Sequence, residues 1–102
     1  MTLVVKSPVW NDLREIGLRI AKDNPVAADS FLTAAEDSFE LLRRQPHIGR
    51  LRSFSAPGIR SWVMPQFQNY LVFYLATENE VQILAVLHGA QDLASALAPR
   101  IQ

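Results

Sequence analysis

Hydrophobic positions recur at two different spacings along this chain, and the spacing predicts which element forms where. The clearest apolar run extends from Val81 to Leu87, in which only Gln82 is polar. A short run that is rich in β-branched residues is typical of a strand with both faces covered. It ends at His88-Gly89, which predicts a turn. We therefore expect this strand in the middle of a sheet, flanked by two other strands.

Two segments upstream have the three- and four-residue apolar spacing of amphipathic helices. The first starts at Ser7-Pro8 and the second at Asn24-Pro25. Ser and Asn are good helix caps, and Pro loses nothing at the first helical position. The tight break between the two segments predicts an antiparallel helical hairpin.

The apolar stripe of each helix is expected to face inward. In the first helix it consists of Val9, Trp10, Leu13, Ile16, Gly17 and Ile20. In the second it consists of Ala28, Phe31, Leu32, Ala35, Phe39 and Leu42. The outer face of the first helix is expected to hold Asp12, Arg14, Glu15, Arg19 and Lys22.

Two further strands are predicted between the hairpin and the apolar run. Residues 59–64 alternate loosely in polarity and are stopped by Pro65. Residues 69–76 form the second strand, with Tyr70, Val72 and Tyr74 on one face. Residues 77–80 form the hairpin turn that leads into the apolar strand.

The remaining segments complete the expected order. Residues 3–6 form a first strand, residues 46–50 a turn, and residues 51–57 an irregular segment. Asp92 is placed to cap a short helix over residues 93–97, which Pro99 ends.

The predicted fold is α+β, in the order β-α-α-β-β-β with a short C-terminal helix. A helical hairpin packed on one face of a small, largely antiparallel sheet is the economical arrangement for one domain over residues 1–102. The opposite face of the sheet is then expected to be either open or covered by something else. An exposed apolar sheet face usually indicates a partner.

Composition narrows the class of protein. An apolar share of 49% is that of a folded globular chain, and no apolar run approaches the roughly 20 residues that span a bilayer. The N-terminus is interpreted as a strand instead of a signal peptide. The chain has no Cys, which excludes disulfides and thiolate chemistry. We expect a cytoplasmic protein.

The formal net charge of zero conceals an uneven distribution. Residues 43–77 contain no acid, and their cations are Arg43, Arg44, Arg50, Arg52 and Arg60. Guanidinium groups suit phosphates and carboxylates, so this basic segment favours an anionic partner. The alternative is ordinary solvated charge on a loop and a helix end.

Few side chains are candidates for chemistry. His88 is a candidate acid or base, because imidazole is the side chain best suited to proton transfer near neutral pH, and Tyr74 is a second candidate proton-transfer group. Asp92 can orient His88, although capping is its simpler role. Two His and scattered acids make no metal set, and four Gly make no phosphate-binding loop.

Arg50 and Arg60 are the preferred contacts to an acidic partner or a phosphate. The alternative for Arg50 is a salt bridge to Glu36 or Glu40. The strand residues Tyr70 and Tyr74, with Val72 and Trp62, are interpreted as core or partner groove and not as a base-stacking surface.

This order of elements, with the residues at its joints, resembles the ParE/RelE superfamily of toxins from bacterial toxin–antitoxin modules. The resemblance extends from Leu3 to about Leu97. It is carried by Asp12-Leu13 with Ile16, Phe39-Glu40-Leu41-Leu42, Pro46-His47-Ile48-Gly49-Arg50, Gly58-Ile59-Arg60, the strand from Asn69 to Tyr74, and the run from Ile83 to Gly89 followed by Asp92-Leu93.

The resemblance implies one of two activities. RelE-like members cut messenger RNA in the ribosome, often with a Tyr near the C-terminus, whereas ParE-like members are associated with poisoning DNA gyrase and have no nuclease chemistry. The long hairpin, with no Lys after Lys22 and no aromatic residue after Tyr74, looks more like ParE. Family members commonly have two Arg before Asp92, where this chain has Ala90-Gln91, so an inactive relative that only binds antitoxin is a third possibility.

The resemblance also implies the partners. A cognate antitoxin is expected to lay an extended or helical segment over the open sheet face and the helix groove, where apolar residues need cover. The target is expected to be gyrase or, in the alternative, the ribosome and its messenger RNA. Neither a cofactor, a membrane nor direct DNA binding by the chain alone is expected. The residues expected at the target are Arg50, Arg52, Arg60 and His88. Those expected at the antitoxin are Trp62, Tyr70, Val72 and Tyr74.

Overall fold

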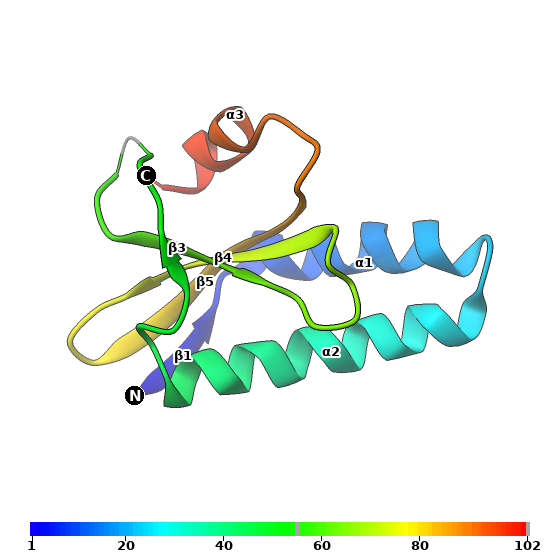
Figure 1. Ribbon diagram of the computed structural model, residues 1–102, viewed down its shortest axis with the longest axis horizontal. Helices are drawn as coiled ribbons and strands as arrows, with labels where there is room; N and C mark the ends of the chain where they lie inside the picture. The colour runs from blue at the N-terminus through cyan, green and yellow to red at the C-terminus, as the bar shows by residue number, and fades with distance from the viewer. Residues whose placement is uncertain (55, 102) are drawn as a thin grey trace.

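The computed structural model describes residues 1–54 and 56–101 and has the α+β architecture predicted from the sequence (Figure 1). In chain order its elements are β1 (Thr2–Val5), α1 (Ser7–Ala21), α2 (Pro25–Arg44), β2 (Arg50–Leu51), β3 (Ile59–Val63), β4 (Tyr70–Ala76), β5 (Glu80–His88), α3 (Leu93–Leu97) and the 3-10 helix η1 (Ala98–Arg100). Within these described residues, neither long helix is apolar enough to cross a membrane.

The strands form one mixed sheet in the order β1-β5-β4-β3-β2. β1 runs parallel to β5, with Val5 opposite Ile83, and the other three pairs are antiparallel. The prediction that β5 lies inside the sheet is confirmed, but its neighbours are β1 and β4, and β3 lies one strand further out. The chain can place β1 beside β5 because the helical hairpin provides the long crossover that parallel strands require.

The segment after the hairpin differs from the prediction. Residues 50 and 51 were expected in a turn and an irregular segment, yet they form β2 and pair with Ser61 and Arg60 of β3. A two-residue strand has no detectable alternation of its own, and its pairing partner sets its conformation.

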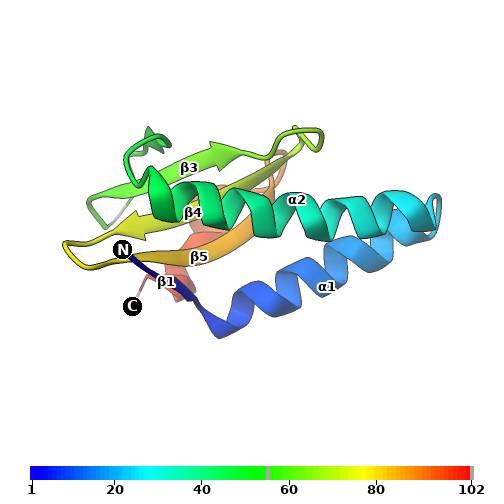
Figure 2. The ribbon, with the colours of Figure 1, turned by 90° about the horizontal axis from the view of Figure 1, so that it is seen from below.

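The two helices lie side by side across one face of the sheet (Figure 2). The Asn24 side chain accepts a hydrogen bond from the Ala27 backbone N–H at 3.1 Å, which confirms it as the cap of α2. The predicted Ser7 cap is wrong, because Lys6 occupies the cap position and makes no side-chain cap bond. The Lys6 N–H donates to the Ile83 carbonyl, so pairing with the sheet holds the chain directly up to the start of α1.

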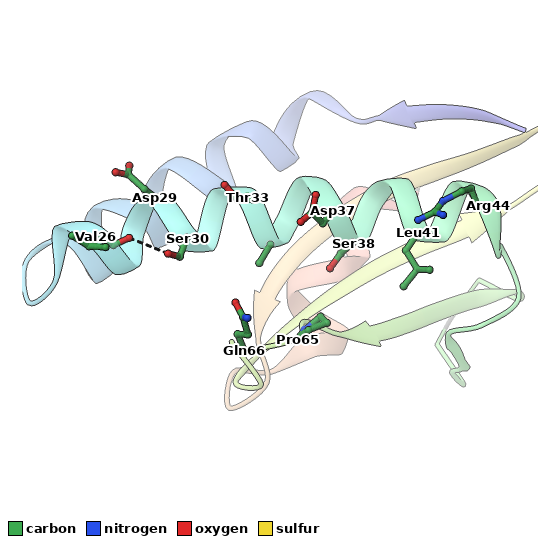
Figure 3. A pocket seen from close by; sticks show the side chains of 11 residues that line it. Val26, Asp29, Ser30, Thr33, Asp37, Ser38, Leu41, Arg44, Pro65 and Gln66 are labelled. Carbon is green, nitrogen blue, oxygen red and sulfur yellow. Dashed lines mark hydrogen bonds between the residues drawn. The ribbon is translucent and has the colours of Figure 1, made fainter.

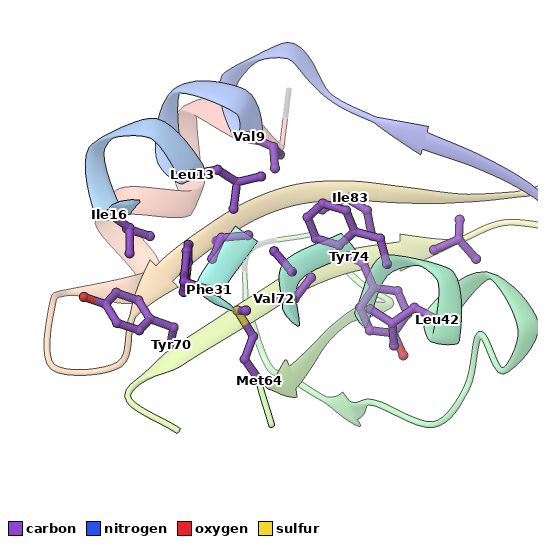
Figure 4. Close-up of a cluster of buried hydrophobic side chains, with 14 residues drawn as sticks. Val9, Leu13, Ile16, Phe31, Leu42, Met64, Tyr70, Val72, Tyr74 and Ile83 are labelled. Carbon is purple, nitrogen blue, oxygen red and sulfur yellow. The ribbon is translucent and has the colours of Figure 1, made fainter. Parts of the chain in front are cut away.

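The larger core lies between the hairpin and the sheet (Figure 4). Phe31 of α2 contacts the rings of Phe67 and Tyr70 edge to face, with centroids 5.3 and 5.4 Å apart. Around them the helices contribute Val9, Leu13, Ile16, Ala35, Phe39 and Leu42, and the strands and their connection contribute Met64, Val72, Tyr74, Val81, Ile83 and Val86.

The opposite face of the sheet is covered and not open, which decides between the two alternatives that the sequence left. A second core there contains Ile59, Phe73, Leu84, Ala85, Leu87 and Leu97. Leu97 belongs to α3, which lies across the sheet from α2 (Figure 1), and Phe54 and Ala56 of the β2–β3 connection pack against the same core. The chain therefore covers this face with its own C-terminal segment and a loop.

Candidate protein-binding surfaces

The loop between α2 and β2 is clamped by two side chains of the predicted site. The Tyr74 hydroxyl accepts a hydrogen bond from the Gly49 N–H at 2.8 Å, and Arg60 Nη1 donates to the Gly49 carbonyl at 2.8 Å and to the His47 carbonyl at 3.3 Å. Burial raises the pKa of the Tyr74 phenol, although the Gly49 N–H and the Arg60 charge act in the opposite direction. Tyr74 and Arg60 therefore fix the loop that carries Arg50.

The structure explains why the turn Pro46-His47-Ile48-Gly49-Arg50 has glycine at position 49. A Cβ at this position would lie 2.5 Å from the Tyr74 hydroxyl oxygen and 2.9 Å from the Ser61 carbonyl oxygen. Such distances are too short for any side chain. Only Gly lets the loop approach Tyr74 closely enough to form its hydrogen bond.

The three predicted target-binding arginines have different environments. Arg50 is exposed, and within the described part of the chain it has no hydrogen-bond or ion-pair partner. The alternative salt bridge from Arg50 to Glu36 or Glu40 is absent among the described residues, and Glu40 pairs instead with Arg43. Arg52 donates to the Ser61 hydroxyl at 3.0 Å, and its guanidinium lies over the rings of Phe54 and Phe73, 5.3 and 5.8 Å from their centroids.

His88 lies at the end of β5 in a small cleft of about 370 Å³ that Arg19, Tyr70 and Arg100 also line. Its Nδ1 accepts a hydrogen bond from the Ala90 N–H at 3.0 Å, and its ring packs edge to face on Tyr70 with centroids 5.1 Å apart. No carboxylate among the described residues orients it.

Asp92 has the capping role. Its side chain accepts from the Ser95 N–H and hydroxyl at 3.2 and 2.8 Å, and these bonds lower the pKa of the carboxyl. Nor do the two candidate proton-transfer groups meet. His88 is opposite Tyr70 at one end of the β4–β5 ladder, whereas Tyr74 is opposite Ile83, four residues further along β4.

The predicted antitoxin-binding residues lie on the hairpin side of β3 and β4. Val72 and Tyr74 are fully buried and Tyr70 is 9% exposed, so these three side chains serve the core in this structure. Trp62 is only partly buried, and its indole N–H is buried without a hydrogen-bond partner among the described atoms. Trp62 is therefore the member of this set that reaches the surface.

An apolar groove runs between α1 and α2 on their outer side. It encloses about 550 Å³ and is lined mostly by carbon, with Arg14 and Glu36 as its charged residues. We call it the hairpin groove; its most exposed apolar side chains are Trp10, Leu18 and Leu32, at 55%, 59% and 39% exposure. Trp10 and Leu32 were predicted to face inward, which is wrong. Leu18, an apolar residue off the inward stripe, was the available sequence signal.

A second groove follows α2 where the β3–β4 connection approaches it (Figure 3). It encloses about 710 Å³ and is polar at its rim, where Asp29, Asp37, Arg44 and Gln66 project. Its mixed charge and solvated rim are ordinary for a protein surface.

Asp12 and Arg100 form a partly buried ion pair that was not predicted from the sequence. Asp12, predicted on the outer face of α1, is only 9% exposed. Its two oxygens accept from both terminal nitrogens of Arg100 at 2.7 and 2.8 Å, which raises the pKa of the guanidinium. Asp12 also accepts from the Val86 N–H, and Arg100 donates to the Leu84 carbonyl. The pair thus provides hydrogen-bond partners for backbone groups of β5 that lie beyond the end of β1. It also links η1 to α1.

In the part of the chain described, His, Asp and Glu side chains do not gather in groups of three that could hold a metal ion.

Comparisons with known proteins agree on the family. The model of the ParE toxin of the type II toxin-antitoxin system, parDE, matches residues 3–93. Toxin ParE3 of Caulobacter vibrioides is 32% identical over 94 residues, which cover 91% of each chain. A solved structure of a chromosomal ParDE toxin–antitoxin system from P. aeruginosa has the same fold, with a TM-score of 0.62 at 20% identity over 86% of this chain and 95% of that one. This chain belongs to the ParE family of type II toxin–antitoxin toxins.

Proposed function

We propose that this chain inhibits DNA gyrase by binding it and is neutralised by a cognate antitoxin. One observation supports binding over catalysis most directly: the two candidate proton-transfer groups have structural roles. Tyr74 is buried and holds Gly49, while His88 accepts a backbone N–H and has no orienting carboxylate among the described residues. RNA cleavage requires a base and an acid close to one phosphate, and the arrangement of Tyr74 and His88 gives that chemistry no support.

The antitoxin is proposed to cover the hairpin groove. Trp10, Leu18 and Leu32 expose apolar surface there, and such a groove suits the apolar face of an amphipathic helix. Arg14 and Glu36 at its margin supply charges of both signs that can set the orientation of the helix. The sheet face that the sequence suggested for this role is already covered by α3.

Two other functions remain as outcomes of the test. A RelE-like nuclease would use the His88 cleft, where Arg19 and Arg100 are near. An inactive relative would follow from Ala90-Gln91, where the family commonly has two Arg. In this chain the Gln91 side chain accepts from the His88 N–H at 3.0 Å, so Gln91 closes the turn after β5.

Pulse-labelling of DNA and protein synthesis tests the proposal, minutes after the chain alone is induced in a bacterial host. The expected result is an early fall in DNA synthesis while protein synthesis continues. Gyrase relieves the torsional strain that replication creates in DNA, so its inhibition stops replication first. An early collapse of protein synthesis would favour messenger cleavage. If neither falls, the chain only binds its antitoxin. The proposed partners place the activity in the cytoplasm.

A further inference from the structure

β2 forms one edge of the sheet, and no strand among the described residues pairs with its outer side. The Arg52 N–H donates to the Ile59 carbonyl at 2.8 Å, and Arg50 is opposite Ser61 in the same antiparallel ladder. Backbone groups of alternate residues point to opposite sides of a strand. The N–H and C=O of Leu51 therefore point away from β3, toward the open edge.

The side chains of this edge have a definite pattern. Leu51 shares a face with Arg60, whereas Arg50 shares the other face with Ser61 and with Arg52, whose guanidinium reaches the Ser61 hydroxyl. Leu51 is 59% exposed, and Arg50 is exposed without a partner among the described residues. We call Arg50, Leu51 and Arg52 the β2 edge.

We propose that the β2 edge is the contact for the target of this toxin, and that the target adds to it an extended segment with an acid–apolar–acid sequence. The apolar residue would lie beside Leu51, and the two acids, on the other face, beside Arg50 and Arg52. The pattern is symmetric, so it holds for a parallel or an antiparallel segment. The proposal rests on the proposed function in so far as the target is gyrase.

The charges of the β2 edge select this occupant. Two copies of the chain paired edge to edge would bring arginines of the same sign together, which disfavours a dimer through β2. Residues 43–77 contain no acid that would compete for Arg50. The edge is also rigid, because Tyr74 and Arg60 hold Gly49, the residue before Arg50. A rigid edge loses little conformational freedom on binding.

Charge reversal on the β2 edge tests the proposal. Arg50→Glu and Leu51→Glu are expected to abolish growth arrest after induction and to weaken inhibition of purified gyrase on the order of tenfold or more. Arg50→Lys, which keeps the charge, and Lys22→Glu, a charge reversal at the exposed C-terminal end of α1, are expected to behave like the wild type. Thermal unfolding of each purified variant separates lost binding from lost fold.

Photo-crosslinking identifies the occupant. With a benzophenone amino acid in place of Leu51, the expected product is a crosslink to an acid–apolar–acid segment of gyrase; the control replaces Val26, which is 75% exposed on α2. Such a crosslink to a different protein would overturn gyrase as target while supporting the edge. Full growth arrest by folded Arg50→Glu and Leu51→Glu variants, or a crosslink to a second copy of the chain, would overturn the edge alone. A wild-type chain without effect on growth would overturn both.

Discussion

Gly49 is the residue with the least room for a side chain, since a Cβ there would lie 2.5 Å from the Tyr74 hydroxyl oxygen. Gly49→Ala must displace the loop or break that hydrogen bond, and we expect a loss of about 1–3 kcal/mol in the free energy of unfolding. Gly17→Ala is the matched control, because nothing lies within 4 Å of its Cβ position and Ala favours the helix. Urea unfolding of both variants measures the difference. Equal stabilities would contradict the clamp.

Tyr74 is expected to make the free energy of unfolding depend on pH in the alkaline range. Burial raises its pKa above the ordinary value of 10.0. The neutral phenol therefore contributes stability that is fully present below about pH 10 and is lost as the pH rises through the folded-state pKa. Tyr74→Phe should cost about 1–3 kcal/mol at neutral pH, because the Gly49 N–H loses its acceptor.

The test of that pH dependence is the difference in the free energy of unfolding between wild type and Tyr74→Phe as the pH is raised. We expect the difference to shrink above about pH 10, because only the wild type has this phenol to ionise. A constant difference at all pH values would show that the Tyr74 phenol is not protected by burial.

Some roles that depend on near neighbours were predictable from the sequence, although the Ser7 cap was not. Asn24 and Asp92 cap helices three residues away, so their roles follow from local spacing. Arg60 was placed among target contacts, whereas its guanidinium holds carbonyls 11 and 13 residues away. Its place in the ladder beside β2 determines that role, and no sequence signal marks a two-residue strand.

At the scale of elements, the Asp12–Arg100 pair joins α1 to η1 across 88 residues. Arg100→Ala leaves a carboxylate that is 9% exposed without its cation, and we expect a loss of about 3 kcal/mol in the free energy of unfolding. We take the lower end of the range for breaking a buried ion pair, because the Arg100 side chain is 20% exposed. Arg43→Ala, which breaks the exposed pair with Glu40, is the control and should change little.

Denaturant unfolding of the two variants measures both effects. Equal losses for Arg100→Ala and Arg43→Ala would mean that the Asp12–Arg100 pair contributes no more than a surface pair. A double variant, Asp12→Asn with Arg100→Ala, is expected to lose less than the sum of the single changes, because the two residues share one interaction.

Element types followed from periodicity, but their neighbours did not. The helices and β3, β4 and β5 have spacings that identify them. The parallel pairing of β1 with β5, and the cover that α3 gives the second sheet face, depend on contacts between distant parts of the chain. Asp12 shows this most clearly. Its position fits the polar face of α1, and nothing near it in the sequence indicates that it pairs with Arg100.

At the scale of the whole molecule, the structure separates two candidate surfaces. The hairpin groove is apolar and lies on the helical layer, whereas the β2 edge is basic and lies at the border of the sheet. A toxin that binds its antitoxin and its target through different groups can lose one partner and keep the other.

Leu18→Glu tests the antitoxin surface. The side chain is 59% exposed, so the fold should persist, but a carboxylate in the hairpin groove should prevent an apolar helix from docking. We expect growth arrest that co-expression of the cognate antitoxin no longer reverses. Val26→Glu, outside the groove, should still be rescued. Rescue of Leu18→Glu to the same extent would place the antitoxin elsewhere.

The proposed inhibition of gyrase by this ParE-family chain can be measured as DNA supercoiling by purified gyrase in the presence of the purified chain. We expect supercoiling to fall as the chain is added, and to recover when the cognate antitoxin is added. Messenger RNA on programmed ribosomes should remain intact in a parallel reaction. Undiminished supercoiling at saturating concentrations of a folded chain, or cleavage of the messenger, would contradict the claim.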